Sequence, residues 1–188
     1  MKLDDRCKPI RLILSDVDGV LTDGRIILDN QGVETKLFHV RDGMGIHLWQ
    51  KAGYRFGLIT LRSSQIVKLR VAELGIDIVR QGVENKLSAM RQILAELRLT
   101  PDQACYIGDD LPDLSAVCGA GLGVAVADAC DELRKSAHYV TIQRGGAGAV
   151  RETIELILKS QNRWDHLIQA YLNDGQTTCN FATLNPEP

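Results

Sequence analysis

Short apolar segments alternate with longer amphipathic segments along most of the chain, and this alternation restricts the possible folds more than any other feature. The apolar segments have the length of buried strands and lie at residues 11–16, 55–60, 77–80, 104–107, 122–126 and 138–141. The segments between them show helical spacing of apolar residues, at about 44–52, 63–74, 84–98, 112–118, 130–136 and 148–171. Such alternation predicts an α/β fold, a Rossmann-like parallel sheet with helices on both faces. Ligands bind at the carboxyl ends of the strands in such sheets.

One stretch, between the first and second predicted strands, departs from this alternation. Residues 24–29 and 34–40 flank Asn30-Gln31-Gly32, which predicts a β-hairpin. The hairpin follows the first strand directly, so we expect a small flap beside the ligand site. The stretch is too short for a large cap domain, and we expect a single domain over residues 1–171. Residues 172–188 are polar and rich in turn-forming residues, which predicts a mobile C-terminal tail.

Composition argues against several classes of protein. The formal net charge of -2 argues against a nucleic-acid binder held by phosphate contacts. The five cysteines are odd in number and widely spaced, so we expect free thiols in a reducing cytoplasm. The first residues lack the apolar core of a signal peptide, and no apolar stretch is long enough to span a membrane. We therefore expect a cytoplasmic protein with neither nucleic acid nor membrane as a partner.

The first predicted strand ends in two acidic residues. An apolar run leads into Asp16 and Asp18, and Gly19 then lets the backbone turn out of the strand. Asp16 and Asp18 are two residues apart, so on a continuing strand their side chains would point to the same side. Two crowded carboxylates repel each other unless a cation or a shared proton relieves them. The apolar run places the pair in a crevice, where a bound cation is the simpler relief.

Polar residues also follow the other predicted strands and the hairpin. They are Arg41, Asp42, Thr60, Arg62, Lys86, Asp109, Asp110 and Asp113. Carboxylates at strand ends make a hard-oxygen site suited to Mg²⁺, a lysine and a hydroxyl can hold an anion, and arginines suit carboxylate or phosphate. This combination predicts phosphoryl transfer. The chain has no Gly-x-x-x-x-Gly-Lys-Ser/Thr loop, so the favoured nucleophile is a carboxylate that forms an aspartyl-phosphate.

These residues resemble the four motifs of the haloacid-dehalogenase-like superfamily, and they occur in the same order. The motifs are Asp16-Val17-Asp18-Gly19-Val20, Thr60, Lys86, and Gly108-Asp109-Asp110 with Asp113. Further segments are similar to the small, cap-less branch of that superfamily, at residues 16–24, 40–43, 108–111, 123–128 and 145–152. The resemblance covers about residues 10–160, which is nearly the whole of the predicted fold.

The resemblance implies a Mg²⁺-dependent phosphatase. Asp16 would be the nucleophile that takes the phosphoryl group. Asp18 would be the general acid for the leaving alcohol and then the general base for water. Asp16, Asp109 and the backbone carbonyl of Asp18 would bind the metal, with Asp110 and Asp113 in support.

On the substrate side, the resemblance implies that Thr60 and Lys86 hold the phosphoryl oxygens. The residues implied to bind the substrate are Asp18, His39, Val40, Arg41, Asp42, Gly43, Arg62, Arg70 and Lys86. The implied substrate is a small phosphorylated sugar acid, a 3-deoxy-octulosonate 8-phosphate of lipopolysaccharide sugar biosynthesis. Members of this branch are similar in being homotetramers, in which each hairpin and tail helps to close a neighbour's active site.

Two positions depart from the pattern of the branch, both on the substrate side. Leu61 stands where a glycine is usual, and His47 stands where an arginine is usual. A nine-carbon ulosonate 9-phosphate is therefore an alternative substrate. A catalytically weak partner domain in a sugar-nucleotide pathway is a further alternative. A phosphomutase or transferase with the same aspartyl-phosphate chemistry is disfavoured, because it would need a cap domain to keep water out.

Some of these residues also have a purely structural interpretation. Thr60 could cap the helix predicted at 63–74, and Asp110 could cap the helix that follows it. Arg70 could be a solvated surface charge. The glycines near the last helix could form only its entry turn, although their N–H groups could also bind an anion; they are Gly145, Gly146 and Gly148.

Overall fold

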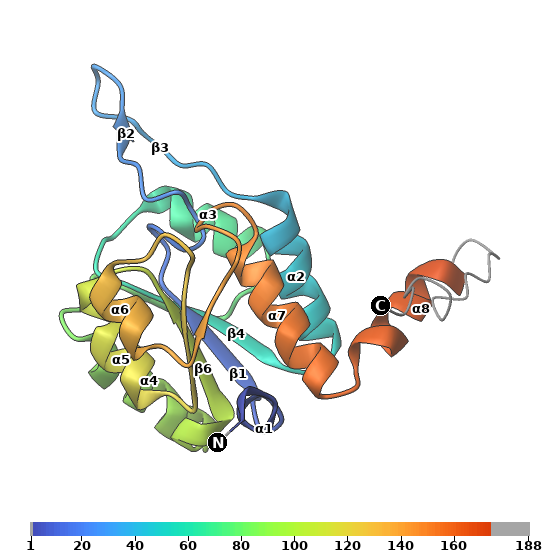
Figure 1. Ribbon diagram of the computed structural model, residues 1–188. Coiled ribbons are helices and arrows are strands. Elements are labelled where there is room, and N and C mark those ends of the chain that lie inside the picture. Colours follow the sequence, from blue (N-terminus) through green and yellow to red (C-terminus); the bar gives the residue numbers. More distant parts are fainter. Residues whose placement is uncertain (1, 174–188) are drawn as a thin grey trace.

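The computed structural model describes residues 2–173, and a six-stranded parallel sheet lies at its centre (Figure 1). Along the sheet the strands follow the order β5-β4-β1-β6-β7-β8. Their bounds are β1 Leu12–Ser15, β4 Arg55–Thr60, β5 Ile78–Gln81, β6 Ala104–Gly108, β7 Leu122–Ala125 and β8 Tyr139–Val140. Each of the six corresponds to a predicted strand, so the prediction of a parallel sheet is confirmed.

Strand β1 occupies the middle of the sheet, and all four of its residues are buried, as expected for an apolar strand covered on both faces. It pairs in parallel with β4 and β6, and Ser15 stands opposite Leu58 and Ile107. The chain therefore leaves all three strands at the same edge of the sheet. The strand order reverses between β4 and β6, and such a reversal opens a crevice at the carboxyl ends of the strands.

Helices cover both faces of the sheet (Figure 1). Helices α2 and α7 pack against each other on one face, and α4, α5 and α6 lie on the other. The α-helices are α1 Leu3–Cys7, α2 Val40–Lys51, α3 Gln65–Glu73, α4 Lys86–Leu97, α5 Leu114–Gly119, α6 Asp131–Ser136, α7 Ala149–Ser160 and α8 Trp164–Asn173, and the 3₁₀ turns are η1 Pro101–Gln103 and η2 Leu111–Asp113. Within residues 2–173, no helix has both the length and the apolar character needed to cross a membrane.

The predicted hairpin is present as two short antiparallel strands, β2 Ile27–Leu28 and β3 Glu34–Thr35. It projects from the body of the molecule, above the edge where β1 ends (Figure 1). It is the only insertion between β1 and α2 in this described part of the chain, so the absence of a large cap domain is confirmed.

Helix α2 begins four residues earlier than predicted and takes Val40 from the predicted second hairpin strand. The cause is local, because His39 has an extended backbone and its Nδ1 accepts the N–H of Arg41, which caps the helix. Asp42 in the first turn further favours a helix start here, since acidic side chains stabilise the positive end of the helix dipole.

The single helix predicted over 148–171 is wrong, because the structure divides it into α7 and α8. The break falls at residues 161–163, where Asn162 has a left-handed backbone with φ 56°. Asparagine tolerates that conformation better than most residues, and a left-handed residue ends a helix. Residues 172 and 173 of the predicted tail belong to α8, and the rest of the predicted tail lies outside the described residues.

Candidate active site

Three carboxylates from two segments meet where β1 and β6 end. Asp16 follows β1 directly, and the register of β1 and β6 brings Asp109 to the same edge of the sheet. Asp113 joins them from η2. One oxygen of each of these three side chains lies within 4.8 Å of the others. Asp16 and Asp113 are buried, so the three carboxylates repel one another strongly when ionised, because water can screen them little.

Glycines allow the backbone to approach this cluster closely. Gly19 has φ 93°, and a Cβ atom there would lie 2.0 Å from an oxygen of Asp109. A Cβ atom on Gly145 would lie 1.7 Å from the carbonyl oxygen of Gly19. The N–H of Gly146 donates to the carbonyl of Val20 at 2.9 Å. The glycines before α7 therefore brace the loop that carries Asp16 and Asp18, beyond their place in a helix entry turn.

Lys86 supplies a positive charge to the cluster. Its ammonium lies 2.7 Å from Oδ2 of Asp16 and 2.6 Å from Oδ1 of Asp113. Lys86 is buried at the start of α4, where the helix dipole disfavours a cation. Burial alone would lower the pKa of Lys86, but the two carboxylates outweigh burial and raise it. Lys86 therefore remains charged, and it lies where it can hold an anion beside Asp16.

Asp113 is the anchor of the cluster. Its Oδ1 accepts from Lys86 and from the hydroxyl of Tyr106 at 2.9 Å, and its Oδ2 accepts the backbone N–H groups of Asp109 and Asp110. Burial, together with Asp113, raises the pKa of Tyr106 well above its usual value, so its hydroxyl remains a donor. Because both oxygens of Asp113 already accept hydrogen bonds, Asp16 and Asp109 are the carboxylates left for a ligand.

The residues present fit a divalent cation. Oδ1 of Asp16 is buried and has no hydrogen-bond partner among the described residues. Burial and the charge of Asp113 raise the pKa of Asp16 to about 6, and the same causes, with Asp16 itself, raise the pKa of Asp109 to about 8. A cation between these oxygens would relieve both the missing partner and the repulsion. All the donors are hard oxygens, which suit Mg²⁺.

The carboxylate of Asp18 is not part of this cluster and pairs with the hairpin instead. Its Oδ1 forms an ion pair with the ammonium of Lys36, the residue that follows β3. Lys36 also contacts Glu34 at 3.3 Å. The sequence analysis did not identify Lys36 or Glu34. Glu34 and Lys36 are two residues apart in the predicted strand 34–40, so their side chains lie on the same face of that strand. This spacing could have identified them as a pair.

Glu34 links the hairpin to the loop between β4 and α3. It accepts hydrogen bonds from the guanidinium of Arg62 at 2.9 Å and from the hydroxyl of Ser64 at 2.6 Å. The bond from Ser64, with Lys36 and Arg62, lowers the pKa of Glu34. Thr60 lies at the end of β4, buried, and its hydroxyl accepts the N–H of Arg62. Thr60 does not cap α3, because the capping position belongs to Ser64.

The predicted sugar contacts fall into two groups. Arg62 lies beside the site, as just described. The guanidinium of Arg70, on α3, lies close to Gly43, so that a Cβ atom added there would be 2.6 Å from it. The same guanidinium lies over the ring of Phe38, 5.5 Å from the ring centroid. It also pairs with Glu73 at 2.8 Å. Arg70 is therefore a packed residue under the start of α2, and the interpretation as a merely solvated charge is wrong.

Residues 39–43 form the start of α2, and they face in different directions. Val40 is 79 % exposed. Asp42 is buried, and its carboxylate accepts the N–H groups of Gly148 at 3.2 Å and Arg151 at 2.8 Å. This carboxylate is thus already engaged within the protein, and the expectation that Asp42 binds substrate stays a prediction. The free N–H groups at the start of α7 attract this carboxylate, and it ties α2 to α7.

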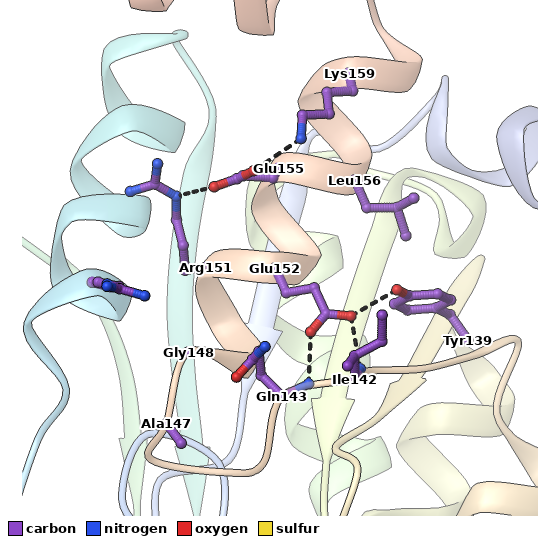
Figure 2. A pocket seen from close by; sticks show the side chains of 11 residues that line it. Tyr139, Ile142, Gln143, Ala147, Gly148, Arg151, Glu152, Glu155, Leu156 and Lys159 are labelled. Carbon is purple, nitrogen blue, oxygen red and sulfur yellow. Dashed lines mark hydrogen bonds and ion pairs between the residues drawn. The ribbon is translucent and has the colours of Figure 1, made fainter. Parts of the chain in front are cut away.

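Arg41 lines a separate cavity of about 650 Å³ beside α7. Figure 2 shows that charged side chains in this cavity pair with one another. Glu152 accepts from the hydroxyl of Tyr139 at 2.7 Å and from two backbone N–H groups, and Glu155 lies between Arg151 and Lys159. No residue of the acidic cluster lines this cavity.

Known proteins resemble this chain over most of its length. The haloacid dehalogenase-like hydrolase family matches residues 63–151. The 3-deoxy-D-manno-octulosonate 8-phosphate phosphatase of Yersinia pestis is 46% identical over 158 residues, which is 84% of each chain. The enzyme of the same name from Escherichia coli K12 is 44% identical over 160 residues, 85% of each chain.

Solved structures agree with this relationship. That of the Moraxella catarrhalis 3-deoxy-D-manno-octulosonate 8-phosphate phosphatase, in complex with magnesium, phosphate and KDO, has a TM-score of 0.88 and 44% identity, and the match covers 89% of this chain and 97% of that one. The cobalt-bound form of the Haemophilus influenzae enzyme has a TM-score of 0.85 and 36% identity, over 89% and 99% of the two chains. The chain therefore belongs to the haloacid dehalogenase-like hydrolases that act on phosphate monoesters, in the family of the 3-deoxy-D-manno-octulosonate 8-phosphate phosphatases.

Proposed function

We propose that this protein is a Mg²⁺-dependent phosphatase that hydrolyses 3-deoxy-D-manno-octulosonate 8-phosphate through an aspartyl-phosphate. The observation that carries the proposal is the approach of Asp16, after β1, to Asp109, after β6, with the buried Lys86 in contact with Asp16. Relatives that are 44–46% identical over more than four-fifths of the chain bear the name of this activity. Asp16, Asp109 and the backbone carbonyl of Asp18 would hold Mg²⁺, which when bound neutralises charge on the phosphoryl oxygens.

In the first step a carboxylate oxygen of Asp16 attacks the phosphorus atom. The bond from phosphorus to the sugar oxygen breaks, and Asp18 gives its proton to that oxygen. Lys86 lies within 2.7 Å of Asp16 and holds a phosphoryl oxygen, and Thr60 holds a second one. The products of this step are the free sugar acid and an aspartyl-phosphate on Asp16.

In the second step water attacks the phosphorus atom of the aspartyl-phosphate. The carboxylate of Asp18 accepts a proton from this water. The bond between phosphorus and Asp16 breaks, and its electron pair returns to the Asp16 carboxylate. Inorganic phosphate leaves, and the enzyme returns to its starting state.

The sugar contacts of this proposal come from Arg62 beside the phosphoryl site, from Arg70 under the start of α2, and from the start of α2 itself. Arg62 and Arg70 suit a substrate that carries a carboxylate as well as a phosphate. His39, Val40, Arg41 and Gly43 lie on or next to the first turn of α2, and Arg41 faces the cavity beside α7. We propose that they serve a sugar bound at a neighbouring subunit.

We further propose that the protein acts as a homotetramer in the cytoplasm and supplies the sugar acid of lipopolysaccharide. Large apolar side chains are exposed on the hairpin and just after it, and such a patch favours a partner surface. They are Ile26, Leu28, Val33, Leu37 and Val40. A second copy of this chain is the simplest partner, because it would bring a neighbour to the edge of the site.

The test is phosphate release from 3-deoxy-D-manno-octulosonate 8-phosphate, with Mg²⁺ and with EDTA. Asp16→Asn is the inactive comparison, because it removes the nucleophile and should lower kcat by at least about 10³-fold. Asp77→Asn is the matched control, since Asp77 is exposed and lies at the opposite end of β5. Metal-dependent release with a high kcat/KM supports the proposal.

Two other results would replace the proposed function with another one. Slow release from this substrate, with faster release from a nine-carbon ulosonate 9-phosphate, assigns the longer sugar, as Leu61 and His47 allow. Wild-type activity no higher than that of Asp16→Asn on either sugar assigns a partner domain without catalysis.

A further inference from the structure

The ammonium group of Lys36 is buried between two carboxylates. Only 1% of this side chain is exposed, and its Nζ contacts Oδ1 of Asp18 and Oε1 of Glu34. Burial of an ammonium is unfavourable unless acceptors compensate it, so this placement depends on both partners. The pairing brings a charge from the hairpin directly onto the side chain that transfers protons in the proposed reaction.

Lys36 is held from the body of the protein as well as from the hairpin. Glu34 contacts Lys36 at 3.3 Å and also accepts from Arg62 and Ser64 in the loop between β4 and α3. Ser64 is itself buried. Two positive and two negative side chains thus form a continuous row of ion pairs, in the order Arg62, Glu34, Lys36 and Asp18. This row fixes the position of the Lys36 ammonium relative to the sheet.

This geometry would orient Asp18 as a general acid toward the leaving oxygen of the substrate. The ion pair uses Oδ1 of Asp18, and none of the hydrogen bonds within residues 2–173 uses Oδ2. Oδ2 is therefore left for the leaving oxygen of the substrate. When Asp18 gives up its proton, negative charge appears on the carboxylate, and the ammonium beside Oδ1 stabilises that charge.

We propose that Lys36 is a positioning residue that orients Asp18 for proton transfer to the leaving group, with Glu34 holding Lys36 in place. This inference rests on the proposed phosphatase function. In the step concerned, the Asp18 O–H bond breaks and the proton goes to the leaving oxygen, while phosphorus forms its bond to Asp16. Lys36 gives up no proton in this step.

The test compares leaving groups, because only a basic leaving group needs a proton. A series of aryl phosphates whose phenols differ in acidity is given to the wild type and to Lys36→Met, and the burst rate of phenol release is measured. With the least acidic phenol, Lys36→Met should be slower by about 10- to 100-fold, which is part of what a general acid contributes. With p-nitrophenyl phosphate the loss should be under about threefold.

Three further variants separate positioning from folding. Lys36→Arg keeps the charge and should recover most of the rate with the least acidic phenol. Glu34→Gln should show the same dependence on the leaving group at smaller amplitude. Lys68→Met, an exposed lysine on α3, is the matched control and should behave as wild type. Magnesium affinity, measured by calorimetry, should be unchanged in Lys36→Met, since Lys36 does not contact the carboxylate cluster.

Equal slowing of every aryl phosphate in Lys36→Met would overturn the inference, because it would indicate phosphate binding or misfolding. An unchanged rate throughout would overturn it as well. Failure of the proposed function is a separate result, since the wild type would then release phenols without acting on 3-deoxy-D-manno-octulosonate 8-phosphate. The aryl series does not depend on which sugar is the substrate.

Discussion

Asp16 and Asp109 show how burial makes two ordinary carboxylates into a cation site. Burial, with Asp113 beside them, raises their pKa values to about 6 and about 8. A raised pKa means that the folded, metal-free protein binds these protons more tightly than the unfolded chain does. This contribution to stability is complete below pH 4, and it is lost as pH rises through 6 and then 8.

Bound Mg²⁺ should therefore matter more at high pH than at low pH. We expect the increase in Tm caused by saturating Mg²⁺ to be larger at pH 8.5 than at pH 5.5, and to be reversed by EDTA. The apparent Mg²⁺ affinity should rise by at most about tenfold per pH unit for each proton displaced. Thermal unfolding and calorimetry in buffers of different ionisation enthalpy measure both quantities. A metal effect independent of pH would show that these two carboxylates are not the ligands.

Gly145 illustrates a residue whose missing side chain matters. An added Cβ atom would lie 1.7 Å from the carbonyl oxygen of Gly19, in the loop that carries Asp16 and Asp18. We expect Gly145→Ala to lower the free energy of unfolding by about 3 kcal/mol or more and to reduce kcat. Gly53→Ala is the comparison, because a methyl group there meets nothing within 4 Å although φ is 86°. It should lower stability by about 1–2 kcal/mol and leave kcat unchanged.

At the scale of elements, one buried carboxylate joins α2 to the start of α7. Asp42 in the first turn of α2 accepts two N–H groups from the start of α7, and burial raises its pKa despite these bonds. We expect Asp42→Ala to lower the free energy of unfolding by about 2–3 kcal/mol, because it leaves both N–H groups unpaired. KM should change little, since the side chain faces α7. A raised KM at wild-type stability would instead support Asp42 as a sugar contact.

Elements defined by local pattern could be predicted from the sequence, and elements set by distant contacts could not. The six strands follow from apolar runs, and the motif residues follow from their positions after these runs. The break at Asn162 was missed because helical spacing continues on both sides of it, and one left-handed residue changes no hydrophobic pattern. The pair of Lys36 with Asp18 was missed because it joins residues 18 apart through the fold of the hairpin.

At the scale of the whole molecule, the sheet gathers residues that are far apart in the chain. Asp16, Lys86 and Asp109 come from three connections, and the parallel register places all three at one edge. The hairpin, by contrast, exposes several large apolar side chains. In the proposed tetramer, a neighbouring subunit would cover these exposed apolar side chains of the hairpin.

The tetramer makes a last prediction about the hairpin. Leu28→Lys together with Val33→Glu places charges on two exposed apolar positions of the flap. If copies of the chain meet there, the double variant should sediment as smaller species than the wild type, because burying these charges in an interface is unfavourable. Activity per chain should fall with dissociation, since neighbours are proposed to complete the site. Leu69→Lys, at an exposed apolar residue of α3 outside the hairpin, should keep the wild-type mass and activity. A double variant with unchanged mass would exclude the hairpin as the interface.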